Sequence, residues 1–187
     1  MRKEYYEMLM DITKTASKDA PTHKTVAVLE NYVMATDAKR ALRITTETPV
    51  RPDGLYQIAK VGKEYQLVAS SETGRYPDVE RIMTVKSKET VTIPCTAVDT
   101  KTGKTVRLHP DYFPGRLLTI FGKLQTMSSA KDVSSLNYQY LAVVAKKMFL
   151  LADDEIQIEY TGSNSPLKLT CRNGLETIEY VIMPLSY

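Results

Sequence analysis

The sequence lacks tryptophan and has few of the residues on which metal and catalytic sites usually depend. Among 187 residues there are two cysteines and two histidines. Cys95 and Cys171 are far apart in strand-like contexts, which predicts two buried free thiols rather than a ligand pair. His23 and His109 fall in loop-like segments with no cysteine or carboxylate at ligand spacing. We therefore expect no bound metal and no cofactor.

The short motifs of several large enzyme classes are also missing. The sequence contains no phosphate-binding GxxxxGK[ST], no dinucleotide-binding GxGxxG, no GxSxG nucleophile motif and no HExxH zinc motif. An acidic run, Asp153-Asp154-Glu155, is the one local candidate for metal-dependent hydrolysis. Its contiguity and the lack of a nearby histidine favour a solvated turn instead. We predict a protein that is not an enzyme.

Long apolar runs are absent as well. No stretch approaches the roughly 18 consecutive apolar residues of a membrane span, and no apolar segment follows the first basic residues as in a signal peptide. We therefore expect a cytoplasmic protein without membrane contact. The composition, 43% hydrophobic and 25% charged, is ordinary for a globular protein, and the net charge of +3 is too small to indicate nucleic-acid binding by itself. The length suits one enlarged domain or two very small ones.

Hydrophobic periodicity predicts an α+β fold. Apolar residues recur at helical spacing over residues 3–18 and 137–150. Alternating, strand-like patterns follow the first segment at 25–29, 32–35, 40–46, 55–59 and 65–69, and the second at 155–160, 167–171 and 177–183. Between them, 90–98 and 105–108 resemble strands joined by a turn, 117–124 fits a strand or a helical turn, and 128–135 is polar like a loop. Two helices packed on mainly antiparallel strands is the expected arrangement.

Four stretches, in chain order, carry family-like motifs. They read VMATDAKRAL at 33–42, GRYPDVERI at 74–82, LNYQYL at 136–141 and YVIMPLSY at 180–187. They resemble V-A-T-D-G-H-R-L-A, G-x-[FY]-P-D-[YF]-x-R-V, F-N-x-x-Y-L and Y-[LV]-[VI]-M-P-[MV]-R-L of the bacterial DNA polymerase III β subunit, the sliding clamp. The resemblance covers residues 1–47, 72–85 and 136–187, and leaves 86–135 without a counterpart.

The resemblance implies a DNA-clamp-like fold with two helices on curved, mainly antiparallel sheets. Clamps close as rings around duplex DNA and bind short peptides of polymerases and other replication proteins in a hydrophobic cleft. By this likeness residues 1–187 would form a single enlarged clamp-like domain, with helix-plus-strand units at 1–85 and 136–187, and homo-oligomers would be needed to close a ring. The implied cleft residues are Thr36, Lys39, Arg40, Ala41, Pro77, Arg81, Ile82, Asn137, Tyr140, Val181, Met183, Pro184 and Leu185, with Arg40 and Arg81 at its rim. The implied DNA-facing residues are Arg2, Lys3, Lys14, Lys18, Lys146 and Lys147.

The chain also departs from the family pattern. Ala38-Lys39 replaces Gly-His, Leu42 falls one place later than the family leucine, Ser186-Tyr187 replaces the final Arg-Leu, and 54–71 has strand patterns where the family has another helix. A second hypothesis therefore stays open, a phage or mobile-element adaptor that keeps the clamp fold without encircling DNA. Taken singly, Thr36-Asp37 suits a side-chain-capped turn, Tyr140 a core position, and each lysine a solvated helix face.

Overall fold

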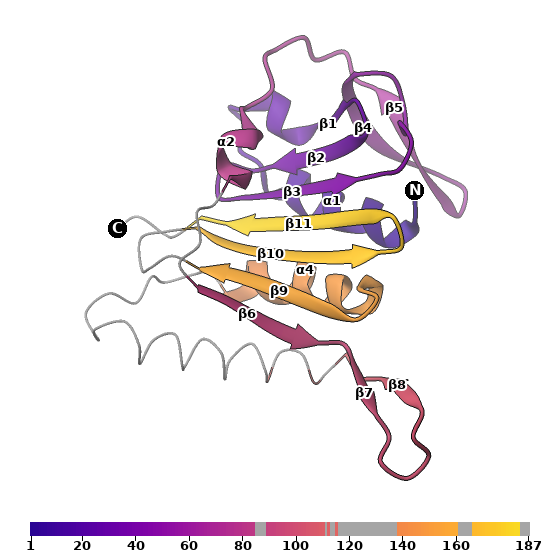
Figure 1. Cartoon of the computed structure of the whole chain (residues 1–187). Helices are drawn as coiled ribbons and strands as arrows, with labels where there is room; N and C mark the ends of the chain where they lie inside the picture. Colours follow the sequence, from indigo (N-terminus) through magenta and orange to yellow (C-terminus); the bar gives the residue numbers. More distant parts are fainter. Residues whose placement is uncertain (85–88, 111, 113–114, 116–137, 161–165, 184–187) are drawn as a thin grey trace, which may run out of the picture. The chain divides into compact units, whose positions relative to one another are not determined.

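The computed structural model of the chain describes residues 1–84, 89–110, 112, 115, 138–160 and 166–183 (Figure 1). The chain divides into two compact units. Unit 1 consists of residues 1–84 and 175–181, and unit 2 of residues 85–174 and 182–187. The last strand of the chain therefore returns to the unit that holds the N-terminus.

Unit 1 combines a helix with an antiparallel sheet. Its elements are α1 (Lys3–Thr15), the 3-10 turn η1 (Pro21–Lys24), β1 (Val26–Leu29), β2 (Tyr32–Thr36), β3 (Arg40–Thr45), β4 (Gly54–Val61), β5 (Glu64–Ala69), α2 (Val79–Met83) and β11 (Glu176–Ile182). The strand order is β5-β4-β1-β2-β3-β11, and α1 packs on β2 and β3. The paired strands β1–β2, β2–β3, β1–β4 and β4–β5 are antiparallel. The strand patterns predicted at 55–59 and 65–69 are confirmed as one hairpin.

The core of unit 1 follows the predicted periodicity. Tyr5, Met8, Leu9 and Ile12 of α1 are fully buried, as their helical spacing requires. The helix ends at Thr15 rather than at residue 18, because Ala16 has an extended backbone with ψ of 142°. Burial of this apolar stripe fixes which side of α1 faces the sheet.

Unit 2 repeats the combination of a helix and antiparallel strands. Its elements are β6 (Glu89–Pro94), β7 (Thr96–Val98), β8 (Thr105–Arg107), α4 (Tyr138–Leu151), β9 (Glu155–Tyr160) and β10 (Leu167–Asn173). The strand order is β10-β9-β6, and β7 and β8 form a separate hairpin. Helix α4 packs on β9 and β10 (Figure 1). Leu141, Val144, Ala145 and Met148, which recur at helical spacing along α4, are all buried.

The α+β fold is thus confirmed, with further differences in detail. The strand expected at 90–98 is split at Cys95, and the short helix α2 lies at Val79–Met83, where the sequence pattern predicted no helix. The segments 117–124 and 128–135 lie outside the described residues. Among the helices that the structure describes, none combines the length and the apolarity that a membrane crossing requires.

Candidate functional site

The turn between β2 and β3 is held by its own side chains. The Asp37 carboxylate accepts hydrogen bonds from the backbone N–H groups of Lys39 and Arg40, each at 3.0 Å. The Thr36 hydroxyl donates to the carbonyl oxygen of Arg40 at 2.9 Å. Ala38, at the place of the family's glycine, has a φ of 69°, a left-handed conformation that strains a residue with a Cβ. The first stretch is therefore a side-chain-capped turn, as its residues taken singly suggested.

Arg40 lies inside unit 1, so its expected place at the rim of a cleft is wrong. Its side chain is 1% exposed and forms ion pairs with Asp37 at 3.0 Å and with Asp11 of α1 at 2.6 Å. It also donates to the Thr15 hydroxyl at 3.0 Å, and it is hydrogen-bonded to Tyr180 of β11. Burial alone would lower the pKa of this guanidinium, but Tyr180 and the two carboxylates outweigh burial and raise that pKa. Arg40 thus joins α1 and β11 to the turn.

Three further cleft candidates from the first and last stretches are also buried. Thr36, Ala41 and Val181 are at most 1% exposed. Side chains in such positions shape a surface only through the residues packed over them. Of the candidates in the first stretch, Lys39 alone is exposed.

The second stretch, which ends in α2, carries three candidates nearer the surface: Pro77 before the helix, and Arg81 and Ile82 within it. Asp78 caps this helix by accepting from the N–H of Arg81, whose own side chain is exposed. Pro77 and Ile82 are half-buried. The helix itself is fastened by its apolar residues, Val79 and Met83, which are buried. Arg81 and Ile82 thus lie on a helix that is packed against unit 1, and Pro77 directly precedes the cap of that helix.

Sequence reasoning missed the charged residues that fasten α2 to the sheet. Arg43 of β3 donates to both carboxylate oxygens of Glu80 on α2 at 2.9 Å, and to Glu179 of β11 at 2.6 Å. The same guanidinium lies 5.7 Å from the centre of the Tyr32 ring. Arg43 thus binds two carboxylates, those of Glu80 and Glu179, at once. These residues lie far apart in the sequence, so no local sequence pattern could indicate the contact.

Two of the unit 2 candidates lie within the described residues. Tyr140, in the first turn of α4, and Met183, directly after β11, are both half-buried. Asn137, Pro184 and Leu185 lie outside the described residues. Tyr140 and Met183 therefore have side chains that retain some solvent contact.

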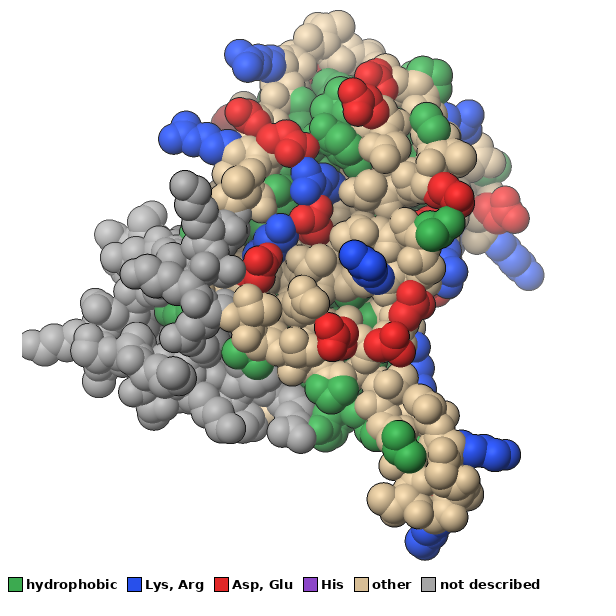
Figure 2. All heavy atoms as spheres, viewed as in Figure 1, with side chains coloured by type: hydrophobic (Ala, Val, Ile, Leu, Met, Phe, Trp, Pro, Cys, Tyr) green, Lys and Arg blue, Asp and Glu red, His purple; other side chains and the backbone are tan. Residues whose placement is uncertain are grey.

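The candidate DNA-facing cations flank or belong to the two long helices. Arg2, Lys3, Lys14, Lys18 and Lys146 are exposed and Lys147 is half-buried. Acidic side chains stand among them. Lys3, for example, lies 3.6 Å from Glu7 one turn further along α1. Figure 2 shows the same mixture on the face it draws, where acidic and basic side chains are interspersed.

Hydrogen bonds hold the acidic run Asp153-Asp154-Glu155 in place. Asp153 accepts from the N–H of Gly174 at 2.7 Å, and the Asp154 carbonyl accepts from the N–H of Cys95 at 2.6 Å. The run is thus an exposed turn between α4 and β9.

Both cysteines are buried and free, and burial raises the pKa of Cys95 to about 11 and that of Cys171 to about 12. Within the described part of the chain, no three histidine, cysteine or acidic residues are grouped as a metal site would require.

Solved structures with a similar fold are bacterial DNA polymerase III β subunits, the sliding clamps. The Bartonella birtlesii clamp bound to griselimycin shares 14% identity, with a TM-score of 0.56, over 98% of this chain and 64% of the clamp. The Streptococcus pneumoniae β chain shares 14% identity, with a TM-score of 0.56, over 100% and 64%. The Helicobacter pylori clamp in complex with diflunisal shares 10% identity, with a TM-score of 0.58, over 98% and 64%.

The chain therefore has a sliding-clamp-like fold and spans just under two thirds of the length of these clamps. No protein-family model and no curated protein matches the sequence. At 10–14% identity the likeness establishes the fold alone.

Proposed function

We propose that the protein acts as a sliding-clamp-like processivity factor of DNA replication. One observation carries the proposal: bacterial clamps match 97–100% of the chain in fold. The four clamp-like sequence stretches lie along the same chain in the family's order. The function is non-enzymatic and needs no cofactor. Its partners are polymerases and other replication proteins that supply short linear peptides, together with duplex DNA and further copies of the chain.

The peptide-binding surface uses the candidates whose side chains reach solvent. Pro77 and Ile82 are half-buried apolar residues of unit 1, and Lys39 and Arg81 are exposed cations of the same unit. Apolar side chains of this kind form an adaptable floor for peptide anchors, because a few buried contacts carry most of the binding free energy. An arginine can bind a backbone carbonyl or a carboxylate at the edge. Lys39 in place of the family histidine adds a permanent charge and favours peptides with acidic residues.

Titration with a fluorescent peptide from a clamp-binding polymerase tests this surface. We expect Arg81→Ala and Ile82→Ala each to weaken binding by about tenfold, the equivalent of ~1.4 kcal/mol. Arg75→Ala is the matched control, because Arg75 is also exposed and lies in the second stretch outside the candidate set. Unchanged affinity in both Arg81→Ala and Ile82→Ala would remove the cleft assignment while leaving the fold untouched.

Encirclement of DNA requires a separate experiment. Contacts of helix lysines with phosphates would be independent of sequence and steeply salt-dependent. We expect the protein to stay on nicked circular DNA, to leave it on linearisation, and to form oligomers by light scattering. A strict monomer at micromolar concentration would refute the ring.

A clamp-fold adaptor that does not encircle DNA is the second candidate. Acidic residues on α1 favour it, since Glu7 lies near Lys3 and Glu4 stands in the first turn. Peptide binding without retention on circular DNA would select this function over the first.

A further inference from the structure

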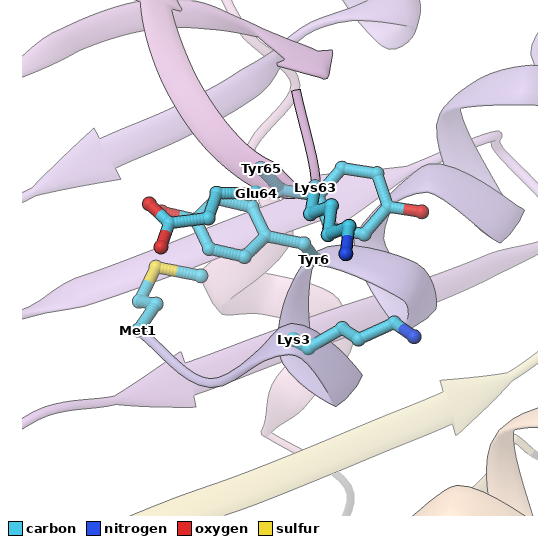
Figure 3. Close-up of a pocket in the computed structure, with 6 residues that line it drawn as sticks. All are labelled: Met1, Lys3, Tyr6, Lys63, Glu64 and Tyr65. Carbon is cyan, nitrogen blue, oxygen red and sulfur yellow. The ribbon is translucent and has the colours of Figure 1, made fainter. Parts of the chain in front are cut away.

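A pocket in unit 1 lies between the first turns of α1 and the hairpin of β4 and β5. It has a volume of about 300 Å³ and is lined by Met1, Lys3, Tyr6, Lys63, Glu64 and Tyr65 (Figure 3). We call it the tyrosine-lysine pocket. This volume is at the lower end of the range for small-molecule sites, so it suits a group no larger than a nucleotide.

The hairpin that builds half of this pocket is the segment in which the chain departs from the clamp pattern. Lys60 pairs with Tyr65 and Val61 with Glu64, and Gly62 supplies the left-handed turn with a φ of 63°. Lys63 in the turn and Glu64 and Tyr65 at the start of β5 line the pocket, so they reach it on a hairpin that stands where the family pattern has a helix.

Two aromatic rings form the centre of the pocket. The Tyr6 and Tyr65 ring centroids are 5.9 Å apart and the planes are inclined by 32°. Stacked bases in nucleic acid are spaced by about 3.4 Å, so a base inserted between two rings would need about 7 Å. The rings are too close for insertion, and a base would stack on an outer face of one ring. Both tyrosines are half-buried, which holds the rings in place while leaving part of each to solvent.

The charges around the rings suit a phosphate. Lys3 and Lys63 line the pocket together with one carboxylate, Glu64; the side chain of Lys3 is 67% exposed and also lies 3.6 Å from Glu7, outside the lining. Arg51 acts electrostatically on Tyr6 from nearby. Figure 3 shows the ammonium groups of Lys3 and Lys63 on one side of the pocket and the Glu64 carboxylate on the other. Cations beside an aromatic platform are the features with which proteins bind single strands.

We propose that the tyrosine-lysine pocket binds a nucleotide of single-stranded nucleic acid. The base stacks on Tyr6 or Tyr65, and the neighbouring phosphates contact Lys3 and Lys63. Glu64 accepts a hydrogen bond from an N–H group of the base, such as the N3–H of thymine. A closed duplex keeps its bases stacked on one another and offers no free base face, so the site selects single strands. The site does not depend on ring closure or on the peptide surface.

Fluorescence anisotropy with the full chain tests the proposal, using a labelled 20-nucleotide oligothymidine and a blunt hairpin duplex as probes. We expect Tyr65→Leu to weaken oligothymidine binding about fivefold or more, the range of one lost base stack, and Tyr65→Phe to keep most of it. Lys63→Gln is expected to reduce the slope of log affinity against log salt by about 0.7, the value for one lost phosphate contact on a single strand.

Lys104→Gln is the matched control for Lys63→Gln. Both lysines are exposed and each follows a left-handed glycine in a hairpin turn, Gly103 and Gly62 respectively. Both variants lose one positive charge. Equal effects of the two lysine variants on oligothymidine binding would overturn the site, because they would reflect net charge only. Wild-type oligothymidine affinity in Tyr65→Leu, or an equal loss for the duplex, would also overturn it.

Discussion

Replacement of Arg40 by methionine is the sharpest perturbation of unit 1. The side chains of Arg40 and Asp37 are each 1% exposed, whereas that of Asp11 is 32% exposed. Removing one partner of a buried ion pair typically costs about 3–5 kcal/mol, since it leaves a buried charge uncompensated. Asp37 would keep its two backbone donors and the Thr15 hydroxyl, and Asp11 can turn to water. We therefore expect a loss near the lower end, about 3 kcal/mol of unfolding free energy.

Urea denaturation followed by far-UV circular dichroism measures this loss, because the chain has no tryptophan for a fluorescence signal. Lys3→Met is the control: it removes a pair at 3.6 Å whose lysine is 67% exposed, and we expect it to cost about 0.5 kcal/mol or less. The double variant Arg40→Met/Asp37→Asn carries no uncompensated charge at Asp37. We expect it to be less destabilised than the sum of the single variants by about 1–3 kcal/mol.

Two results would refute this reasoning. A loss below about 1 kcal/mol in Arg40→Met would mean that the guanidinium contributes no more than a surface ion pair. Strict additivity in the double variant would mean that Arg40 and Asp37 do not stabilise unit 1 through each other.

Three smaller effects are also expected. Ala38→Gly should raise the unfolding free energy by about 0.5–1 kcal/mol in the same urea experiment, since glycine adopts a φ of 69° without strain. Cys95 and Cys171 should resist a thiol reagent at pH 8 in the native protein and react in urea, because their folded pKa values are about 11 and 12. The unfolded thiols ionise at about pH 8.5, so unfolding by urea should become easier as pH rises from there towards 11. Arg107→Met should lower the melting temperature and reduce the free energy of unfolding by about 1 kcal/mol. The reason is that the guanidinium donates to the carbonyl groups of Phe149 and Ala152, at the C-terminal end of α4, at 2.6 and 2.5 Å. Lys104→Met is the control.

The sequence predicted the helices and strands in which hydrophobic residues recur with a clear periodicity. Helices α1 and α4 and strands such as β9, found at Glu155–Tyr160, lie within a few residues of their predicted bounds. Helix α2 was missed because five residues are too few for a helical period to be visible. Its available signal was Asp78, which stands three residues before Arg81 and caps the helix.

The candidate site was less predictable than the fold, because burial of a charged residue depends on distant partners. The family resemblance placed Arg40 at the rim of a cleft, and this agreed with the usual exposure of arginine in proteins. Its partner Asp11 lies on α1 and its partner Tyr180 on β11, far away along the chain. The pair Asp37 and Arg40 was readable from spacing, but the spacing alone could not distinguish a solvated pair from a buried one.

The burial of these residues changes how the match to the clamp motifs is interpreted. In the first stretch, the matching residues Thr36, Asp37 and Arg40 direct their polar groups to the turn, to α1 and to β11. A match to the clamp motif at these positions indicates that the same buried hydrogen bonds hold the turn in place. The match therefore supports the fold. Under the proposed function, recognition of a peptide would depend on side chains that reach solvent, such as Lys39 and Arg81. Since Lys39 departs from the family motif and Arg81 agrees with it, the proposal predicts a peptide preference that differs from that of the clamps on the same kind of fold.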